Sequence, residues 1–273
     1  MITDIHMHIG GEALGFHMTK EMVLEVFEKY NVGYGMISDC DGGECDNQHN
    51  IIPEELQVTQ EESLRNAVEF ARENPGKFCV AAWIRPRVQG ITDEFCNIVE
   101  ENLDIIKAIK IHPFASDVSP VDKRVIPYIE LAKKHNLFVI SHTGGSEKAS
   151  CENLYRAAKM FPSIPFVMAH MGLGTDNSQA LELMNKADNL FGDTAWVPME
   201  TAVKAVERFG SEKMFFGTDA PIDGVDTYKC NPRGERSVYV DYFEKLPQII
   251  GDRAYEDLMY KNARDILNVY PAK

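Results

Sequence analysis

Apolar residues recur along the chain at two alternating spacings, one typical of buried strands and the other of amphipathic helices. Short apolar runs rich in Val, Ile and Phe predict eight strands, at Ile2–His8, Gly33–Ser38, Phe78–Ile84, Ile105–His112, Leu137–His142, Ile164–His170, Asn189–Asp193 and Lys213–Thr218. Stretches with helical periodicity predict helices, at Thr19–Tyr30, Glu61–Glu73, Asp93–Asn102, Val121–His135, Cys151–Phe161, Asn177–Ala187, Glu200–Phe209 and Asp252–Val269. Strand and helix therefore alternate along the whole chain.

The spacing of the predicted strands indicates how they are arranged. Their starts lie 24 to 32 residues apart, with one interval of 45 residues between residues 33 and 78. Eight strand–helix units of this size are what a closed parallel barrel requires, whereas an open doubly wound sheet usually has fewer strands. We therefore expect an α/β fold, a distorted (β/α)8 TIM barrel, that forms a single domain over residues 1–273.

The long interval predicts an inserted loop after the second strand. The insertion falls between Asp39 and Thr59 and is rich in Asp, Gly, Asn and Pro. Because it follows a strand, it is expected at the barrel mouth, where such loops build active sites. Two interpretations stay open at this point, a lid over the mouth and a plain surface excursion.

Composition narrows the class of protein further. With 44% apolar and 26% charged residues and no long apolar run, the chain is expected to be globular and to lack a membrane span. Its formal charge of −14 would repel a phosphate backbone, so nucleic acid is not expected as a partner. The start of the chain lacks the basic and apolar segments typical of a signal peptide, and we expect a cytoplasmic protein.

The six cysteines show no repeated Cys-X-X-Cys spacing, and a chain of this size needs no disulfide framework. We interpret them as reduced thiols. Cys40, Cys45, Asp46 and His49 share the inserted loop, and a second metal site there is a minor alternative, because their spacing matches no known zinc signature closely.

Two histidines at the end of the first strand have the spacing of a metal pincer. His6 and His8 are two positions apart, and side chains two apart in a strand point to the same face, so their ring nitrogens can converge on one ion. Taken alone, the pair is equally compatible with chance.

Further polar residues end strands in apolar contexts, where an unpartnered polar group would be costly. They are Lys110 and His112 after the fourth strand, His142 after the fifth, His170 after the sixth and Asp219 after the eighth. Singly, each is explained as well by a structural hydrogen bond or a helix cap. In a barrel, however, these strand ends meet at one mouth. Histidines and an aspartate together are typical ligands of zinc or a similar divalent ion, so the sequence predicts a metal centre.

These residues stand in motifs that resemble those of the amidohydrolase superfamily of metal-dependent barrels, in the branch shared with metal-dependent decarboxylases. The resemblance covers essentially the whole chain, in the segments Asp4-Ile-His6-Met-His8, Lys110-Ile-His112-Pro113, His142-Thr-Gly, Ala-His170-Met-Gly, Gly-Thr-Asp219-Ala-Pro and Asn262-Ala263-Arg264. Taken in order, they are highly specific for the superfamily and weakly specific for a substrate.

The resemblance implies a division of roles at the metal centre. His6, His8 and Asp219 would hold the more buried ion, His142 would join them, and His170 would bind a second ion or act from close by. We expect one or two divalent ions, zinc first among them.

Lys110 is the residue on which the number of ions depends. In members with two ions, a lysine on this strand is carboxylated and bridges them, and the segment around Lys110 resembles the dihydroorotase version. In members with one ion, this lysine is often absent or serves the substrate. His112 shares the face of Lys110 by alternation and is expected to contact the substrate.

The expected reaction is hydrolysis of an amide, a cyclic amide or an ester such as a lactone by a metal-activated water. Asp219 would take a proton from that water and return it to the leaving group, assisted by His170. We expect Arg85, in preference to Arg87, to form a bidentate ion pair with a substrate carboxylate. Trp196 would form an apolar wall of the pocket or pack against the helix layer.

Rival functions stay open. In a metal-dependent non-oxidative decarboxylase or lyase, the ion would chelate an unsaturated or aromatic acid and His170 would handle protons. A carboxylated Lys110 favours hydrolysis, because it implies two ions. The third interpretation is a catalytically silent barrel, and the retention of all candidate ligands argues against it. The expected partner is a small-molecule substrate, and a homo-oligomer is an option that is common among soluble enzymes.

Overall fold

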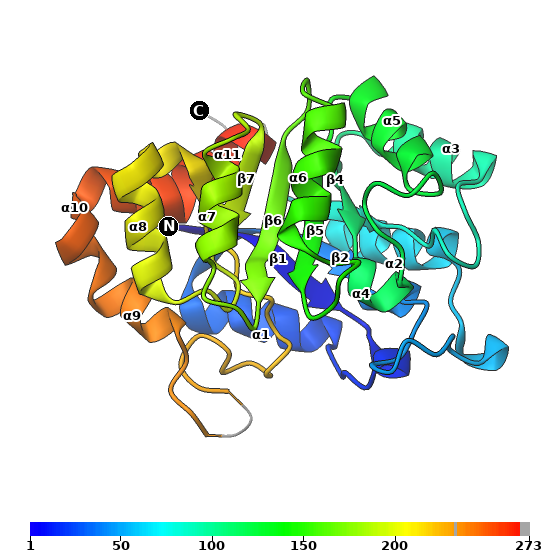
Figure 1. Ribbon diagram of the computed structural model, residues 1–273. Helices are drawn as coiled ribbons and strands as arrows, with labels where there is room; N and C mark the ends of the chain where they lie inside the picture. Colours follow the sequence, from blue (N-terminus) through cyan, green and yellow to red (C-terminus); the bar gives the residue numbers. More distant parts are fainter. Residues whose placement is uncertain (232–233, 268–273) are drawn as a thin grey trace.

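The computed structural model describes residues 1–231 and 234–267 and shows parallel strands wrapped by helices (Figure 1). The strands run in chain order around one sheet, each paired in parallel with the next: β1 (Ile2–Ile9), β2 (Val32–Asp39), β3 (Phe78–Trp83), β4 (Ile106–Ile111), β5 (Phe138–Gly144), β6 (Phe166–Leu173), β7 (Leu190–Asp193) and β8 (Met214–Phe215). The predicted (β/α)8 TIM barrel is confirmed.

The barrel closes through the residues that follow the short β8. Phe216 O accepts from Ile5 N at 3.0 Å, and Ala220 O accepts from His8 N at 2.9 Å. Asp219 N in turn donates to His6 O at 2.7 Å. The strand predicted at Lys213–Thr218 is therefore wrong in extent, because its second half leaves the regular ladder with β7 and bonds to β1. This departure brings Asp219 alongside His6.

Helices cover the outside of the barrel, and most begin within a residue or two of the predicted positions. They are α1 (Lys20–Tyr30), α2 (Gln60–Glu73), α3 (Asp93–Glu101), α4 (Pro113–Ser116), α5 (Ile126–Lys134), α6 (Cys151–Met160), α7 (Ser178–Met184), α8 (Met199–Phe209), α9 (Tyr239–Glu244), α10 (Leu246–Glu256) and α11 (Asn262–Leu267). Hydroxyl side chains of Thr19, Thr59, Thr92 and Ser150 accept from backbone N–H groups and start four of them.

The helix predictions differ from the structure in three respects. The helix predicted from Val121 begins only at Ile126, and the short helices α4 and α9 were missed. In place of the predicted tail helix, α10, a π-helical turn and α11 follow one another. The expected end at Val269 lies outside the described residues.

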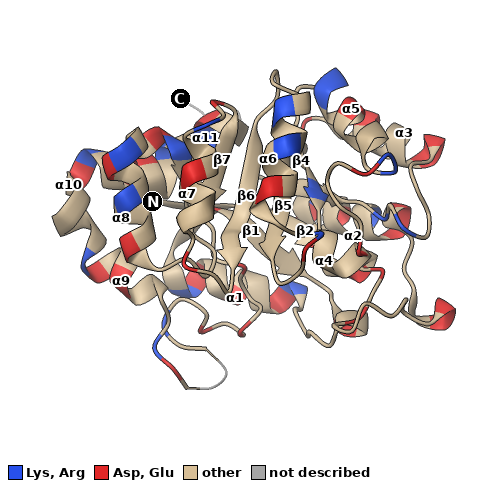
Figure 2. Cartoon of the chain, in the orientation of Figure 1, with Lys and Arg blue, Asp and Glu red and all other residues tan. Residues whose placement is uncertain are grey.

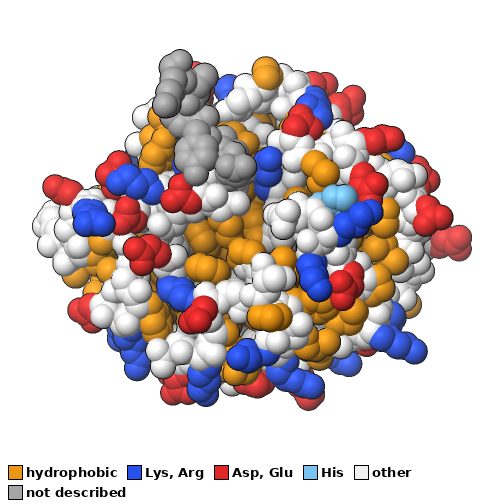
Figure 3. All heavy atoms as spheres, turned by 90° about the horizontal axis from the view of Figure 1, so that it is seen from above, with side chains coloured by type: hydrophobic (Ala, Val, Ile, Leu, Met, Phe, Trp, Pro, Cys, Tyr) orange, Lys and Arg blue, Asp and Glu red, His pale blue; other side chains and the backbone are white. Residues whose placement is uncertain are grey.

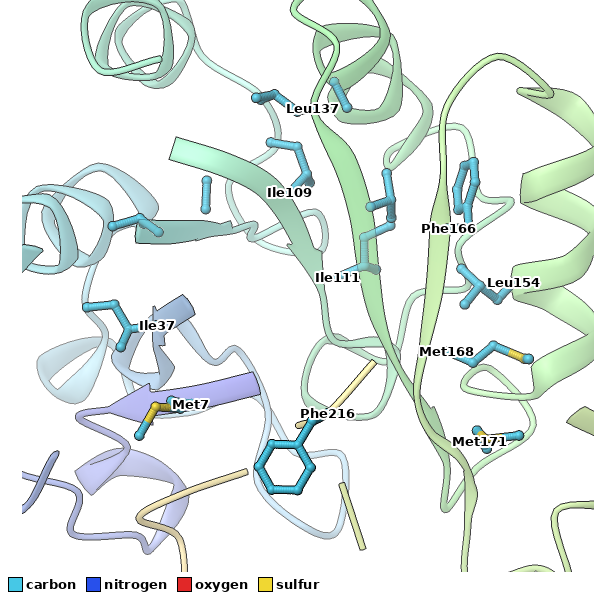
Figure 4. Packing of buried hydrophobic residues seen from close by; sticks show 14 of the residues in the cluster. Met7, Ile37, Ile109, Ile111, Leu137, Leu154, Phe166, Met168, Met171 and Phe216 are labelled. Atoms are coloured by element: carbon cyan, nitrogen blue, oxygen red, sulfur yellow. The ribbon is translucent and has the colours of Figure 1, made fainter. Parts of the chain in front are cut away.

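The apolar core forms two layers. The larger lies between strands and helices, where residues such as Ile109, Leu154 and Phe166 pack together (Figure 4). The smaller fills the barrel interior below the strand ends and includes Ile5 and Phe138. The pairing register of β1 shifts between Asp4 and Met7, and this irregularity lets Ile5 join the interior although it is adjacent to His6.

Charged side chains gather on the helices and loops around the barrel (Figure 2). Figure 3 looks onto the end of the barrel where the strands begin, and shows hydrophobic side chains in a hollow ringed by charged ones. Within the described ranges, none of the helices has the length and apolar character that a membrane crossing requires.

The loop between β2 and α2 is the predicted insertion, and it lies at the barrel mouth. Glu44 anchors the loop through both its backbone and its side chain. Its backbone N donates to Ala115 O at 3.0 Å, and its Oε1 accepts from Arg87 N and Val88 N at 2.9 and 2.8 Å. Because these partners follow β3 and β4, the insertion is bound to the neighbouring loops of the mouth.

Candidate metal centre

Imidazole, amine and carboxylate groups converge where the strands end. His6 and His8 come from β1, Lys110 from β4, His170 from β6 and Asp219 from the segment after β8, and every one of these side chains is buried. Their ligand atoms are brought together by the barrel, since residues far apart in the chain meet at its mouth.

Three of these residues form a compact group. His6, His170 and Asp219 each offer a ligand atom, and these atoms lie within 4.8 Å of one another. Asp219 Oδ1 also lies 2.9 Å from His8 Nε2 and 3.2 Å from His6 Nε2. Its second oxygen accepts from Trp196 Nε1 at 3.1 Å. The carboxylate is therefore oriented by three neighbours, with one oxygen facing the histidines of β1.

Asp193 at the end of β7 sets the orientation of His6. Its Oδ2 lies 2.7 Å from His6 Nδ1, while its Oδ1 accepts from His170 N at 2.8 Å and Ala195 N at 3.1 Å. A proton on Nδ1 directed at a carboxylate leaves Nε2 of His6 with its lone pair toward the site. Burial raises the pKa of Asp193 to about 6. The sequence analysis missed this residue, although its position at a strand end was the available signal.

His170 is held by its backbone as well as its ring. Nδ1 lies 3.1 Å from Ala195 O, so it carries the proton and leaves Nε2 as an acceptor. His170, Trp196 and Asp219 have φ angles of 68°, 56° and 67°, in the left-handed region that non-glycine residues seldom adopt. Such strain costs on the order of 1–3 kcal/mol per residue and clusters at functional sites.

Asp4 supports the segment that carries Asp219. Its Oδ1 accepts from His6 N at 3.0 Å and Thr218 N at 3.2 Å, and its Oδ2 accepts from Thr218 Oγ1 and from Tyr228 OH at 2.8 Å. Burial raises the pKa of Asp4 to about 7. This carboxylate therefore links β1 to the chain after β8 without facing the cavity itself.

Burial also controls the charge of the histidines. It lowers the pKa of His6, His142 and His170, with the positive charge of Lys110 acting in the same direction. Neutral imidazoles with free lone pairs are the form that binds a metal ion. Burial acts to raise the pKa of Asp219, but the neighbouring histidines, His6 first, outweigh it and hold that pKa well below its usual range.

Lys110 occupies a central position. Its side chain is 1% exposed, and Nζ lies 2.8 Å from His6 Nε2, the nitrogen that faces the site. Burial lowers the pKa of Lys110. Carboxylation of Lys110 and a bridged pair of ions stay predictions, since the described residues contain a single candidate ligand group.

His142 and His112 lie beside this group rather than in it. His142 Nε2 lies 3.2 Å from Gly144 O, and its ring stacks on His112 with centroids 4.2 Å apart. His112 Nδ1 accepts from Ala115 N at 3.0 Å, which places the proton of a neutral ring on Nε2. The geometry thus does not gather His142 with the three ligand atoms, and it leaves His112 as a hydrogen-bond donor.

The two arginines expected near the substrate have other partners. Arg85 is buried behind the inserted loop, where its guanidinium donates to Val58 O and to Gln57 Oε1 at 2.6 Å. Arg87 pairs with Asp117 at 3.3 Å. Neither lines the cavity described below, so a carboxylate clasp by Arg85 has no support in this geometry.

The inserted loop does not form a second metal site within the described residues. Cys40, Cys45, Asp46 and His49 do not gather into a candidate ligand group. Cys40 and Cys45 are buried in the cavity wall, and Cys45 Sγ accepts from Arg87 Nη1 at 3.1 Å.

A cavity of about 210 Å³ opens directly above the candidate ligands. Its wall includes His8, His170 and Asp219 together with mainly apolar side chains from the strand ends and loops. Trp196 lines an adjoining outer pocket instead, which shares Asp219 with the cavity.

The donor set fits a divalent metal ion. Two imidazole nitrogens and a carboxylate oxygen are ligands that zinc accepts, and the second nitrogens of His6 and His170 are fixed by a carboxylate and a backbone carbonyl, as is usual for metal-binding histidines. His6, His170 and Asp219 would hold such an ion, with His8 next to Asp219.

Comparison with known proteins agrees with the fold. Residues 53–269 match the family model described as amidohydrolase, a range that contains Lys110, His142, His170 and Asp219 but not β1. None of the curated proteins matches the chain.

Solved structures share the barrel at low sequence identity. An uncharacterised TIM-barrel protein from Bordetella bronchiseptica is 18% identical, with 98% of each chain covered and a TM-score of 0.69. The probable 2-pyrone-4,6-dicarboxylic acid hydrolase of Acinetobacter baumannii is 14% identical, with 98% of this chain and 99% of that chain covered and a TM-score of 0.64. The 2,6-dihydroxybenzoate decarboxylase from Rhizobium is 11% identical, with 98% of each chain covered and a TM-score of 0.67.

Proposed function

This chain belongs to the amidohydrolase family, and on that basis we propose that it is a hydrolase that uses a divalent metal ion, zinc in the first instance, to cleave an amide, a cyclic amide or an ester such as a lactone. Its proposed partner is a small-molecule substrate. The proposal goes beyond the family, which contains enzymes of more than one reaction type among its structural relatives.

The position of Asp219 carries the proposal. Its carboxylate lies in the wall of the cavity, with Oδ1 toward His6 and His8 and Oδ2 held by Trp196. Because its pKa lies well below the usual range, the carboxylate is ionised at neutral pH, and its free lone pairs face the position of an attacking water.

A bound divalent ion would lower the pKa of a water and polarise a substrate carbonyl. Asp219 would take the proton from the attacking water and return it to the leaving group. His112, with its proton on Nε2, can donate a hydrogen bond to a substrate oxygen from the cavity wall. His170 would remain neutral and keep Nε2 available at the site.

Non-oxidative decarboxylation is the second candidate function, and two observations favour it. The described residues contain one candidate ligand group rather than two, which removes the argument that a bridged pair of ions would give to hydrolysis. The rings of Trp83, His112 and His142 also stack along the cavity, where an aromatic acid could lie. A decarboxylase of 2,6-dihydroxybenzoate shares the fold.

Metal analysis together with two substrate panels tests the proposal. The first panel contains neutral esters, lactones and cyclic amides, with acid release followed at constant pH, and the second contains hydroxybenzoates, with release of carbon dioxide followed. We expect one ion per chain and turnover of the first panel. At saturating zinc, Asp219→Asn should keep the fold and the metal but lose kcat by about 100-fold or more, the usual range for a lost general base.

His17→Ala is the matched control, because His17 is an exposed loop histidine whose ring nitrogen pairs with Glu12. It should keep full activity. Carbon dioxide release without hydrolysis would refute the hydrolase and support the decarboxylase. Full activity in Asp219→Asn would remove Asp219 from the mechanism. Failure to bind zinc after reconstitution would refute both functions.

A further inference from the structure

We propose that the hydroxyl group of Tyr239 positions the metal ligands, because it joins the two peptide groups that orient His170 and Asp219. This role rests on the metal centre of the proposed function and adds to it a residue that lies outside the ligand group. Tyr239 is the first residue of α9, a helix that the sequence analysis missed, and its side chain is 0% exposed.

The hydroxyl uses both its donor and its acceptor capacity. It donates to Thr218 O at 2.7 Å and accepts from Trp196 N at 2.8 Å. The ladder between β7 and β8 extends only as far as Asp193 and Phe215, so both of these partners lie beyond it. The phenol therefore ties the segment after β7 to the segment after β8, at the end of the barrel where the candidate ligands meet.

The peptide group between Ala195 and Trp196 orients His170. Its N–H donates to the hydroxyl of Tyr239, and its carbonyl oxygen accepts from His170 Nδ1 at 3.1 Å. Because a peptide group is planar, a partner that fixes its N–H also fixes the direction of its C=O. Tyr239 thereby holds the acceptor that keeps the proton of His170 on Nδ1 and leaves Nε2 free for an ion.

The peptide group between Thr218 and Asp219 is held in the same way. Its carbonyl oxygen accepts from the hydroxyl of Tyr239, and its N–H donates to His6 O at 2.7 Å. Rotation of this peptide would change the φ angle of Asp219, which is 67°. The phenol therefore fixes the backbone from which the carboxylate of Asp219 extends.

Both peptides precede a residue in a strained conformation. The φ angles of Trp196 and Asp219 are 56° and 67°, and such angles persist only where several contacts enforce them. Without the hydroxyl, Trp196 N and Thr218 O would lose this partner, and both peptides could relax toward less strained angles. We expect the result to be misdirected ligands rather than a missing ligand.

Tyr239→Phe tests this role, and Tyr242→Phe is the matched control. Tyr242 lies on the same helix, is also 0% exposed, and donates through its hydroxyl to Val197 O at 3.0 Å. Competition with a chromogenic chelator measures the zinc dissociation constant. We expect it to rise at least about tenfold in Tyr239→Phe, the lower end of the range for a lost partner of a metal ligand, and to stay within about threefold of the parent in Tyr242→Phe.

Cobalt(II) bound in place of zinc reports whether the ligands have moved, because its visible absorption depends on the coordination geometry. The spectrum should change in Tyr239→Phe and match that of the parent in Tyr242→Phe. A parent-like zinc affinity in Tyr239→Phe overturns the inference, and so does an equal loss of affinity in both variants. A weakened affinity with an unchanged cobalt spectrum overturns it as well, since it indicates general destabilisation.

Hydrogen exchange in the parent protein provides a test that needs no folded variant. By linkage, an ion that is held by the ligands must in turn stabilise the peptide that Tyr239 binds. Zinc should therefore slow exchange of the Trp196 amide at least about tenfold more than that of the Thr201 amide, which donates to Pro198 O just beyond it in the chain. Equal slowing of the two amides overturns the inference.

Failure of this role is distinguishable from failure of the proposed function. Equal zinc affinity in the parent and in Tyr239→Phe would refute the role of Tyr239 alone. The expected contrast between Tyr239→Phe and Tyr242→Phe, in a protein that cleaves no ester, lactone or amide, would refute hydrolysis while leaving Tyr239 as a positioning residue. A parent protein that binds no zinc would refute the metal centre and this role with it.

Discussion

Replacing Asp193 by asparagine should weaken metal binding although Asp193 does not itself belong to the candidate ligand group. Asp193 uses both oxygens: Oδ2 receives the proton of His6 Nδ1 at 2.7 Å, and Oδ1 accepts from the backbone N–H groups of His170 and Ala195. Asparagine cannot reproduce this pattern, because one of its two terminal atoms is a donor.

Either orientation of the new amide breaks a contact. With its NH2 group toward His6, the imidazole must accept at Nδ1 and carry its proton on Nε2, where the metal lone pair is needed. With its oxygen toward His6, the NH2 group meets two backbone donors. Loss of such a partner typically costs 10- to 100-fold in metal affinity, which corresponds to about 1.4 to 2.8 kcal/mol.

Competition with a chromogenic chelator measures the effect as the ratio of zinc dissociation constants. Asp188→Asn is the matched control, because Asp188 is exposed and lies just before the same strand. Circular dichroism and thermal unfolding establish that the variants retain the fold. A zinc affinity for Asp193→Asn equal to that of the parent, in a folded protein, would refute the assignment of His6 as a ligand oriented by Asp193.

Two further predictions concern other carboxylates. Burial raises the pKa of Glu44 from 4.5 to about 7, so folding favours its protonated form. The stability that Glu44 contributes below pH 4.5 is therefore lost as pH rises to 7, by up to about 3 kcal/mol. Between pH 5 and pH 7 the free energy of unfolding in urea should fall less for Glu44→Gln than for the parent protein, and an identical fall would contradict this. Trp196→Phe removes the hydrogen-bond donor to Asp219 Oδ2. We therefore expect kcat to drop roughly tenfold and the acid limb of the kcat/KM profile to move to higher pH. An unchanged pH profile would show that Trp196 does not position the carboxylate.

Periodicity was sufficient to predict the barrel, because each strand and helix must bury its apolar face whatever its neighbours are. The same local logic placed His6, His8, His170 and Asp219 at strand ends, and the parallel barrel then required those ends to meet. Prediction from local periodicity was wrong where a segment forms its hydrogen bonds with a distant part of the chain. The extent of the last strand, for example, depends on hydrogen bonds from its final residues to β1.

The details that control the chemistry came from contacts between distant segments. Asp193 orients His6 across 187 positions of sequence, and Trp196 fixes an oxygen of Asp219. Arg85 is the residue type expected to bind a substrate carboxylate, yet its guanidinium is hydrogen-bonded to the inserted loop and does not line the cavity. Residue type and spacing specify which groups reach the mouth, whereas proton positions, charge and cavity shape arise only when packing sets the neighbours of each group.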